Sequence, residues 1–108
     1  MKTFARAVSI QCRVLGEENS KEHRLAVTEE NDVLVWDVAA GRFTADGSLT
    51  EGTKRRAREA PFQARCPSCS PHDRHIHTPH RGYYMCAACM KLHTDAEMID
   101  AATKVVDK

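Results

Sequence analysis

The sequence predicts an α+β fold, in which a small antiparallel sheet is followed by a basic helix, a hairpin that carries cysteines and a C-terminal amphipathic helix. Three observations support this prediction. Apolar and polar residues alternate in much of the first 45 residues, which is typical of half-buried strands. Two segments rich in helix-forming residues follow capping-box sequences. Between them, four cysteines form two Cys-x-x-Cys pairs.

The N-terminal part predicts four strands. The first is expected over residues 3–15, where an apolar face is interrupted only by Arg6 and consists of Phe4, Val8, Ile10, Cys12 and Val14. Further strands are expected over residues 23–28, 33–38 and 42–44, separated by polar turns. The segment 33–38 is the most β-prone of the chain, so its Trp36 is expected to be buried in the sheet core. Cys12, on the apolar face, is expected to be a buried thiol.

Two helices are predicted after the sheet. Ser48-Leu49-Thr50-Glu51 has capping-box spacing, and the residues up to Ala60 favour a helix that ends before Pro61. We expect a boundary there, with the sheet and basic helix in residues 1–60 and the cysteine module and last helix in residues 61–108. The last helix is expected to begin at Thr94-Asp95-Ala96-Glu97 and to pack through the apolar residues Met98, Ile99, Ala102, Val105 and Val106.

The cysteines Cys66, Cys69, Cys86 and Cys89 have the spacing C-x2-C-x16-C-x2-C. Two such turns, brought together by a hairpin, place four soft sulfur ligands around one tetrahedral ion. The spacing therefore predicts one zinc ion per chain. Iron is an alternative, because a tetrahedral thiolate shell accepts both metals. Two disulfides are the alternative in an oxidising compartment.

The two knuckles resemble the zinc-ribbon family, on the residues Cys66-Pro67-Ser68-Cys69 and Tyr84-Met85-Cys86-Ala87-Ala88-Cys89. The resemblance covers residues 65–92 and implies a structural zinc on a hairpin, with strands expected over residues 73–78 and 81–85. Ser70 stands where the family often has glycine, so a treble clef or another small knuckle fold is an alternative. Zinc ribbons occur in transcription factors, ribosomal proteins, nucleic-acid enzymes and interaction modules, so the resemblance leaves the function open.

Five histidines lie close to the cysteines in the sequence: His72, His75, His77, His80 and His93. Any of them could replace a cysteine as the fourth ligand of the metal. Because four cysteines already complete a structural site, we expect these histidines to be exposed polar residues of the hairpin.

The charge distribution suggests a partner. Between Lys54 and Arg81, seven lysines and arginines stand against two acidic residues, although the net charge of the chain is only +1. Phosphates would meet these charges and bases would stack on nearby rings. We expect contact with nucleic acid or with a complex that processes it, through Lys54, Arg55, Arg56, Arg58, Arg74, Arg81, Tyr83 and Tyr84. The alternative is a protein-interaction adaptor or a small inhibitor of the phage or plasmid accessory type, without direct nucleic-acid binding.

Several classes of protein are not expected. The sequence has neither His-Glu-x-x-His nor a phosphate-binding glycine loop. It also lacks the signature of zinc deaminases, His-x-Glu followed by Pro-Cys-x-x-Cys. We therefore expect a protein that is not an enzyme. No run of about 18 apolar residues predicts a membrane span. The first residues lack a signal-peptide pattern, so we expect a cytoplasmic protein, where close cysteines bind metal more often than they form disulfides.

Overall fold

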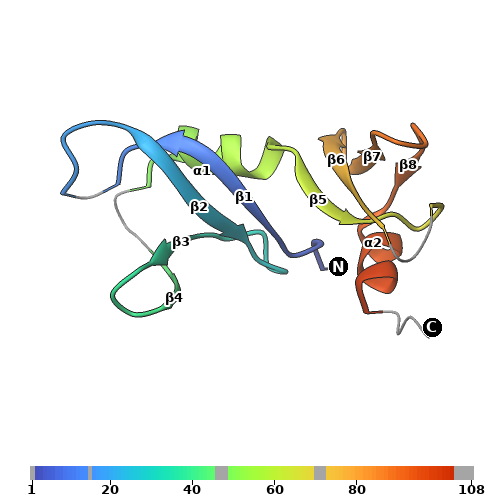
Figure 1. The fold of residues 1–108 in the computed structure, drawn as a ribbon, viewed down its shortest axis with the longest axis horizontal. Coiled ribbons are helices and arrows are strands. Elements are labelled where there is room, and N and C mark those ends of the chain that lie inside the picture. The colour runs from blue at the N-terminus through green and yellow to red at the C-terminus, as the bar shows by residue number, and fades with distance from the viewer. Residues whose placement is uncertain (1, 15, 46–48, 70–72, 104–108) are drawn as a thin grey trace.

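The computed structural model describes residues 2–14, 16–45, 49–69 and 73–103. Its elements are two four-stranded antiparallel sheets, each with its strands in chain order, and two helices. The predicted α+β class is therefore confirmed. The molecule is elongated, 45 by 29 by 25 Å, with the first sheet at one end and the second at the other, and β5 leads from one to the other (Figure 1).

The first sheet consists of β1 (Arg6–Cys12), β2 (Lys21–Val27), β3 (Val33–Asp37) and β4 (Arg42–Thr44). The expected alternation in β1 is confirmed, since Val8, Ile10 and Cys12 are buried. Helix α1 (Glu51–Glu59) packs against this sheet and buries Ala57 in the same core.

The start of α1 differs from the prediction. The N-cap is Thr50, whose Oγ1 accepts a hydrogen bond from the N–H of Thr53 at 3.1 Å. Ser48, the expected cap, lies outside the described residues. The helix ends at Glu59, ahead of Pro61 as expected.

The second sheet consists of β5 (Phe62–Arg65), β6 (Arg74–His80), β7 (Tyr83–Cys86) and β8 (Leu92–His93). The expected β6–β7 hairpin is present, but β6 ends two residues later and β7 begins two residues later than expected. Its turn is therefore formed by Arg81 and Gly82, with φ of 51° and 86°. Two central residues with positive φ form a type I′ turn, which matches the twist of antiparallel strands. Strands β5 and β8, of four and two residues, are not predicted from the sequence.

The predicted start of helix α2 (Asp95–Thr103) is confirmed. The Oγ1 of Thr94 accepts from the N–H of Glu97 at 3.2 Å, and the carboxylate of Glu97 accepts from the N–H of Thr94 at 2.8 Å. This reciprocal pair is a complete capping box. Met98 is fully buried, whereas Val105 and Val106 lie outside the described residues. Neither of the helices described has the length and apolar character to cross a membrane.

The two sheets meet at a cluster of aromatic rings. The ring centroids of Phe4 and Phe62 are 5.7 Å apart, and those of Phe62 and Tyr84 are 5.4 Å apart. The guanidinium of Arg6 lies 5.2 Å from the centroids of both Phe62 and Tyr84. It donates hydrogen bonds to the carbonyl oxygens of Phe4 at 2.9 Å and Arg58 at 2.7 Å. Arg6 interrupts the apolar face of β1 because it fills this junction.

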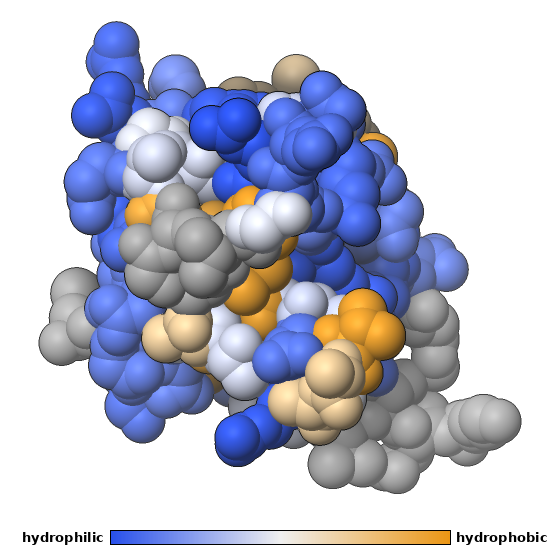
Figure 2. All heavy atoms as spheres, turned by 90° about the vertical axis from the view of Figure 1, so that its left-hand side faces the viewer, coloured by the Kyte–Doolittle hydropathy of each residue, from blue (hydrophilic) through white to orange (hydrophobic). Residues whose placement is uncertain are grey.

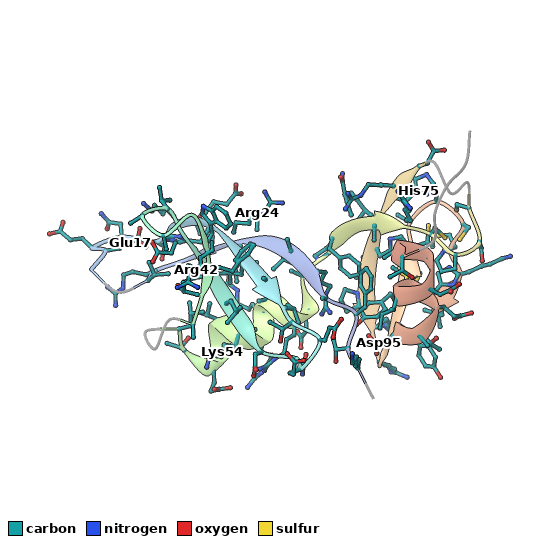
Figure 3. All side chains as sticks on the ribbon, turned by 90° about the horizontal axis from the view of Figure 1, so that it is seen from below. Glu17, Arg24, Arg42, Lys54, His75 and Asp95 are labelled. Atoms are coloured by element: carbon teal, nitrogen blue, oxygen red, sulfur yellow. The ribbon has the colours of Figure 1, made fainter. Side chains whose placement is uncertain are left out.

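Asp95, at the start of α2, completes the junction between the sheets (Figure 3). Its Oδ1 accepts from the N–H of Phe4 at 2.8 Å and from the hydroxyl of Tyr84 at 2.5 Å. Arg6 also donates to the Tyr84 hydroxyl oxygen at 3.2 Å. One polar cluster therefore joins β1 of the first sheet to β7 and α2 of the second half.

The predicted burial of Trp36 is wrong, since its side chain is 41% exposed. Strand β3 turns Val33 and Val35 into the core, so Trp36 lies on the opposite face. Its ring packs edge-on against Phe43 of β4, with the centroids 5.0 Å apart. Figure 2 shows the end of the molecule at which β3 and β4 lie, where hydrophilic residues dominate and apolar residues form small groups.

The exposure of Trp36 has an optical consequence. We expect red-shifted fluorescence in the native protein and quenching by iodide, because water and ions reach the ring. Phe43→Ala should increase the quenching, since it removes the ring that covers one edge. Blue-shifted emission that iodide leaves unchanged in the native protein would contradict this exposure.

Candidate metal centre

The first knuckle is a tight turn at the end of β5. Cys66 follows the strand directly, and the N–H of Cys69 donates to the carbonyl oxygen of Cys66 at 3.3 Å. The N–H of Ser68 donates to the Sγ of Cys66 at 3.4 Å. Successive backbone N–H groups of such a turn favour negative charge on the sulfur they face.

The second knuckle begins at the last residue of β7, Cys86. The N–H of Met90 donates to the carbonyl oxygen of Cys86 at 2.8 Å, and Met90 takes the left-handed conformation with φ of 61°. The backbone N–H groups of Ala88 and Cys89 donate to the Sγ of Cys86. The first knuckle thus directs one amide N–H at the sulfur of Cys66, and the second directs two at the sulfur of Cys86.

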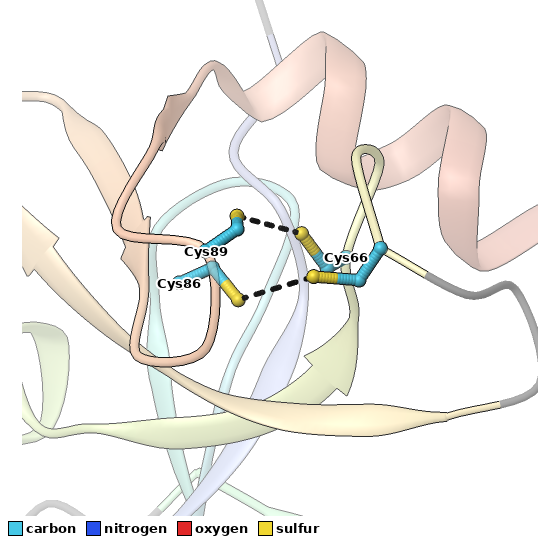
Figure 4. Close-up of side chains that lie close together, drawn as sticks. Cys66, Cys86 and Cys89 are labelled. Atoms are coloured by element: carbon cyan, nitrogen blue, oxygen red, sulfur yellow. Dashed lines mark hydrogen bonds between the residues drawn. The ribbon is translucent and has the colours of Figure 1, made fainter.

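The four sulfur atoms come together between the knuckles, all within 4.8 Å of one another. The Sγ atoms of Cys66 and Cys89 are 3.6 Å apart, and those of Cys69 and Cys86 are 3.9 Å apart (Figure 4). A tetrahedral ion with metal–sulfur bonds of about 2.3 Å requires sulfur separations of about 3.8 Å. A disulfide would require about 2.05 Å. The predicted cysteines therefore form a cluster that can hold a metal ion, which is compatible with the zinc-ribbon resemblance.

The environment of the thiols changes their acidity. Burial raises the pKa of Cys66, and the neighbouring sulfurs, first of all that of Cys66, raise the pKa of Cys69 to about 12. At Cys86 burial raises the pKa, but the amide donors of Cys89 and Ala88 outweigh it and the pKa falls to about 6. One thiolate forms readily here, whereas full ionisation of four adjacent sulfurs needs a cation between them.

Two histidines lie beside the sulfurs without joining them. The Nε2 of His93 is 3.4 Å from the Sγ of Cys66, and the Nδ1 of His75 is 4.0 Å from the Sγ of Cys86. Both can donate an N–H to a ligand sulfur, which orients the ligand and lowers the charge that it presents. Within the part of the chain that the structure describes, the metal-binding cluster consists of the four cysteines alone.

The predicted exposure of the histidines is wrong for His77 and His93, which are 0% and 3% exposed. The ring of His77 stacks on Phe62, with the centroids 5.8 Å apart, and its Nδ1 donates to the carbonyl oxygen of His75 at 2.8 Å. Burial lowers the pKa of His77, so its ring is a neutral part of the core. His80 is exposed next to the hairpin turn, and His72 lies outside the described residues.

Several of the predicted nucleic-acid contacts are used within the fold. Three arginines donate to backbone carbonyl oxygens. Arg56 donates to that of Gln11 at 2.7 Å, Arg58 to that of Asn31 at 3.1 Å, and Arg74 to that of Gln63 at 3.0 Å. Lys54 lies 3.8 Å from the carboxylate of Glu51. Arg55 is exposed on α1.

The two tyrosines on β7 have different surroundings. Tyr83 is 45% exposed, whereas Tyr84 is buried and hydrogen-bonded to Asp95, so Tyr84 presents no ring face for stacking. Tyr83, Arg81 and Arg58 line one hollow between α1 and the β6–β7 turn, which Glu59 and Asp95 also line.

The junction around Tyr84 has a consequence for pH dependence. Burial, followed by the hydrogen bond to Asp95, raises the pKa of Tyr84 from 10 to about 12. The folded state then holds the proton more tightly than the unfolded chain, so stability is lost as pH rises from about 10 towards about 12. In Tyr83→Phe, which keeps Tyr84 as the remaining tyrosine, the phenolate absorbance of folded protein is expected to appear near pH 12. Half-ionisation near pH 10 in folded protein would contradict the buried hydrogen bond.

Comparisons of the chain with protein-family models, with curated proteins and with solved structures give no match. Function must therefore follow from the chemistry and the surfaces of this chain, among which the cysteine cluster has the clearest chemistry.

Proposed function

We propose that this chain is a small, non-enzymatic zinc-binding protein, in which the metal holds the second sheet in the shape that binds a partner. The observation that carries the proposal is the convergence of the four sulfurs, all within 4.8 Å of one another and with two separations, 3.6 and 3.9 Å, close to those around a tetrahedral ion. Four thiolate ligands leave no open position for water or substrate, which distinguishes structural from catalytic zinc sites. Zinc is favoured over ferrous iron by the order of affinities of divalent metals.

The size of the second half supports a structural role for the metal. Its strands have four, seven, four and two residues. So small a sheet buries little apolar surface, and in such modules the free energy of metal binding is also free energy of folding. The metal would join the end of β5 to the end of β7, two segments that are otherwise connected through the whole β6 strand.

Cobalt substitution tests the identity of the site. Zinc-free protein refolded with Co²⁺ is expected to show intense sulfur-to-cobalt charge-transfer bands and tetrahedral d–d bands, which one equivalent of Zn²⁺ abolishes. Cys12→Ser is the matched control, because Cys12 is buried in the first sheet and should leave the spectrum unchanged. A weak octahedral spectrum, or iron that zinc does not displace, would contradict a zinc site.

A protein is the partner that the surface favours. The guanidinium groups of Arg56, Arg58 and Arg74 bond to carbonyl oxygens of the chain itself, so part of the basic stretch stabilises the fold. Exposed apolar side chains lie on the second sheet and its second knuckle: Ile76, Met90 and Leu92. Apolar surface that is rimmed by polar residues is typical of protein-binding sites.

Nucleic acid is the second candidate, and the hollow that Arg58, Arg81 and Tyr83 line favours it. If these groups hold a phosphate backbone, binding of single-stranded or double-stranded oligonucleotides should weaken steeply with salt. Arg81→Glu should then reduce the log–log salt slope by about 0.7 to 0.9 for each lost phosphate contact. Arg42→Glu, on β4, is the matched control. The absence of binding at low salt would exclude this candidate.

A further inference from the structure

A hollow on the described surface lies between the two sheets, where β1 and β5 come near one another. It is open to solvent and has a volume of about 820 Å³. Both strands are at the edge of their sheets, since β1 pairs only with β2 and β5 only with β6. Edge strands carry backbone N–H and C=O groups that can pair with another strand.

The pairing of β2 shows which groups of β1 face the hollow. The N–H of Thr28 donates to the carbonyl oxygen of Asp32 towards β3, so the alternate residues Leu25 and Val27 turn their backbone groups to β1. Their partners in the register are Val8 and Arg6. Arg6 and Val8 therefore turn their backbone groups to β2. The alternate residues of β1, Ala7 and Ser9, turn their N–H and C=O groups to the free edge. Gln11, next in this series, confirms the direction, because its carbonyl oxygen accepts from Arg56 outside the sheet.

The same argument applies to β5. The carbonyl oxygen of Ile76 accepts from the N–H of Ala87 at 2.9 Å, so Ile76 turns its backbone groups towards β7. Gln63 lies opposite Ile76 in the register and turns its own groups away from β6. Both sides of the hollow are strand edges, but on β5 the outward carbonyl oxygen of Gln63 already accepts from Arg74, so β1 is the edge that can pair with a further strand.

The edge of β1 lacks the usual protection against pairing. Natural edge strands often carry lysine, proline or a bulge. Ala7 and Ser9 are small and exposed, and β1 pairs with β2 without a bulge from Arg6 to Cys12. The edge is therefore flat and accessible over the length of a short peptide strand.

The walls of the hollow are positively charged. The hollow is lined by four arginines, Arg6, Arg24, Arg65 and Arg74. None of its described lining residues is acidic. Arg65 and Arg74 stand opposite each other in the β5–β6 register, which concentrates positive charge on this wall. Ile76, 49% exposed in the same wall, offers an apolar contact. An acidic side chain next to an apolar one would satisfy both features.

We propose that this hollow binds an extended, acidic segment of a partner protein, which adds a strand to the free edge of β1. The inference rests on the proposed role of the chain as a protein-binding module. A second copy of the chain would bring the same arginines face to face. A phosphate backbone would meet the outward carbonyl oxygens of Ala7 and Ser9, which repel it, whereas a peptide strand pairs with both donors and acceptors.

Selection from a random heptapeptide display library on the zinc-loaded full chain tests the proposal. Wild-type protein and the control Arg42→Glu, changed at an exposed arginine of β4, are expected to enrich peptides in which Asp or Glu alternates with β-branched residues. Arg24→Glu, at an exposed arginine that lines the hollow, should lose this enrichment while the metal content and the free energy of unfolding stay unchanged. Ala7→Pro removes an outward N–H without removing a bond to β2, and it should weaken the strongest selected peptide by about fivefold or more.

Amide hydrogen exchange locates the bound peptide. In its complex with wild-type protein, the N–H groups of Ala7 and Ser9 are expected to exchange more slowly, while that of Val8, already bonded to β2, changes little. The proposal is overturned if no peptide is enriched, if enriched peptides lack the acidic pattern, or if Ala7 and Ser9 gain no protection. It is also overturned if these residues are protected by dimerisation or by an oligonucleotide. Zinc-loaded protein without peptide binding refutes this inference alone, whereas protein without a metal site refutes the proposed function.

Discussion

Cys86→Ser is expected to abolish stoichiometric metal binding and to unfold the second sheet. Cys86 is fully buried, and its sulfur lies 3.9 Å from that of Cys69. Structural zinc in small modules contributes about 10–16 kcal/mol of apparent binding free energy at neutral pH, which is more than a sheet of this size can replace. In NMR spectra, the dispersed signals of β5 to β8 should collapse, and the metal content should fall to the background value.

Two comparisons make this result specific. Cys12→Ser should keep one metal ion per chain and the native spectrum, since Cys12 packs in the core of the first sheet. The core of that sheet contains Val8, Leu25 and Val27, which are buried without help from the knuckles, so its signals should persist in Cys86→Ser. A Cys86→Ser protein that retains one tightly bound ion and native signals from β7 would contradict the four-cysteine site.

Arg6→Met is expected to lower the free energy of unfolding by about 3 kcal/mol, as removal of one partner from a buried charged cluster does. Methionine fills much of the volume but cannot donate to the carbonyl oxygens of Phe4 and Arg58 or to the Tyr84 hydroxyl. The Nε of Arg6 is buried, and this burial lowers the pKa of the guanidinium. Urea unfolding of the zinc-loaded protein measures the change.

The control for this substitution is Arg24→Met, at an exposed position on β2, which should change stability by no more than about 0.5 kcal/mol. Because Arg6 lies where the sheets meet, Arg6→Met should also separate the unfolding of the two sheets, seen as different midpoints for Trp36 fluorescence and for metal release. Equal midpoints together with wild-type stability would show that the junction does not hold the sheets together.

The cysteine cluster was predictable from the sequence because each knuckle is a local turn, in which spacing alone determines that two sulfurs converge. The second capping box was predictable for the same reason, since Thr94 and Glu97 bond within one turn. Strand β1 was predictable because apolar and polar residues alternate over its seven residues, and β3 because it is a run of β-prone residues bounded by polar turns.

Features that depend on distant contacts were not predictable. In β3, Leu34 and Trp36 are as apolar as Val33 and Val35, so alternation could not show which pair faces the core. Arg56 and Arg58 bond to carbonyl oxygens of residues 45 and 27 positions away, and nothing in the basic stretch itself indicates those acceptors. His77 and His93 look like polar hairpin residues until the second sheet places them against Phe62 and Cys66.

Native mass spectrometry of the purified protein tests whether the four cysteines hold one zinc ion. We expect a single species, the 12.1 kDa chain with one zinc ion and with the four ligand thiols deprotonated. Acid should release the zinc and return the mass of the fully reduced chain with five thiols. A metal-free chain four hydrogen atoms lighter than the reduced form, which would contain two disulfides, or a chain with iron in place of zinc, would contradict a zinc site of four cysteines.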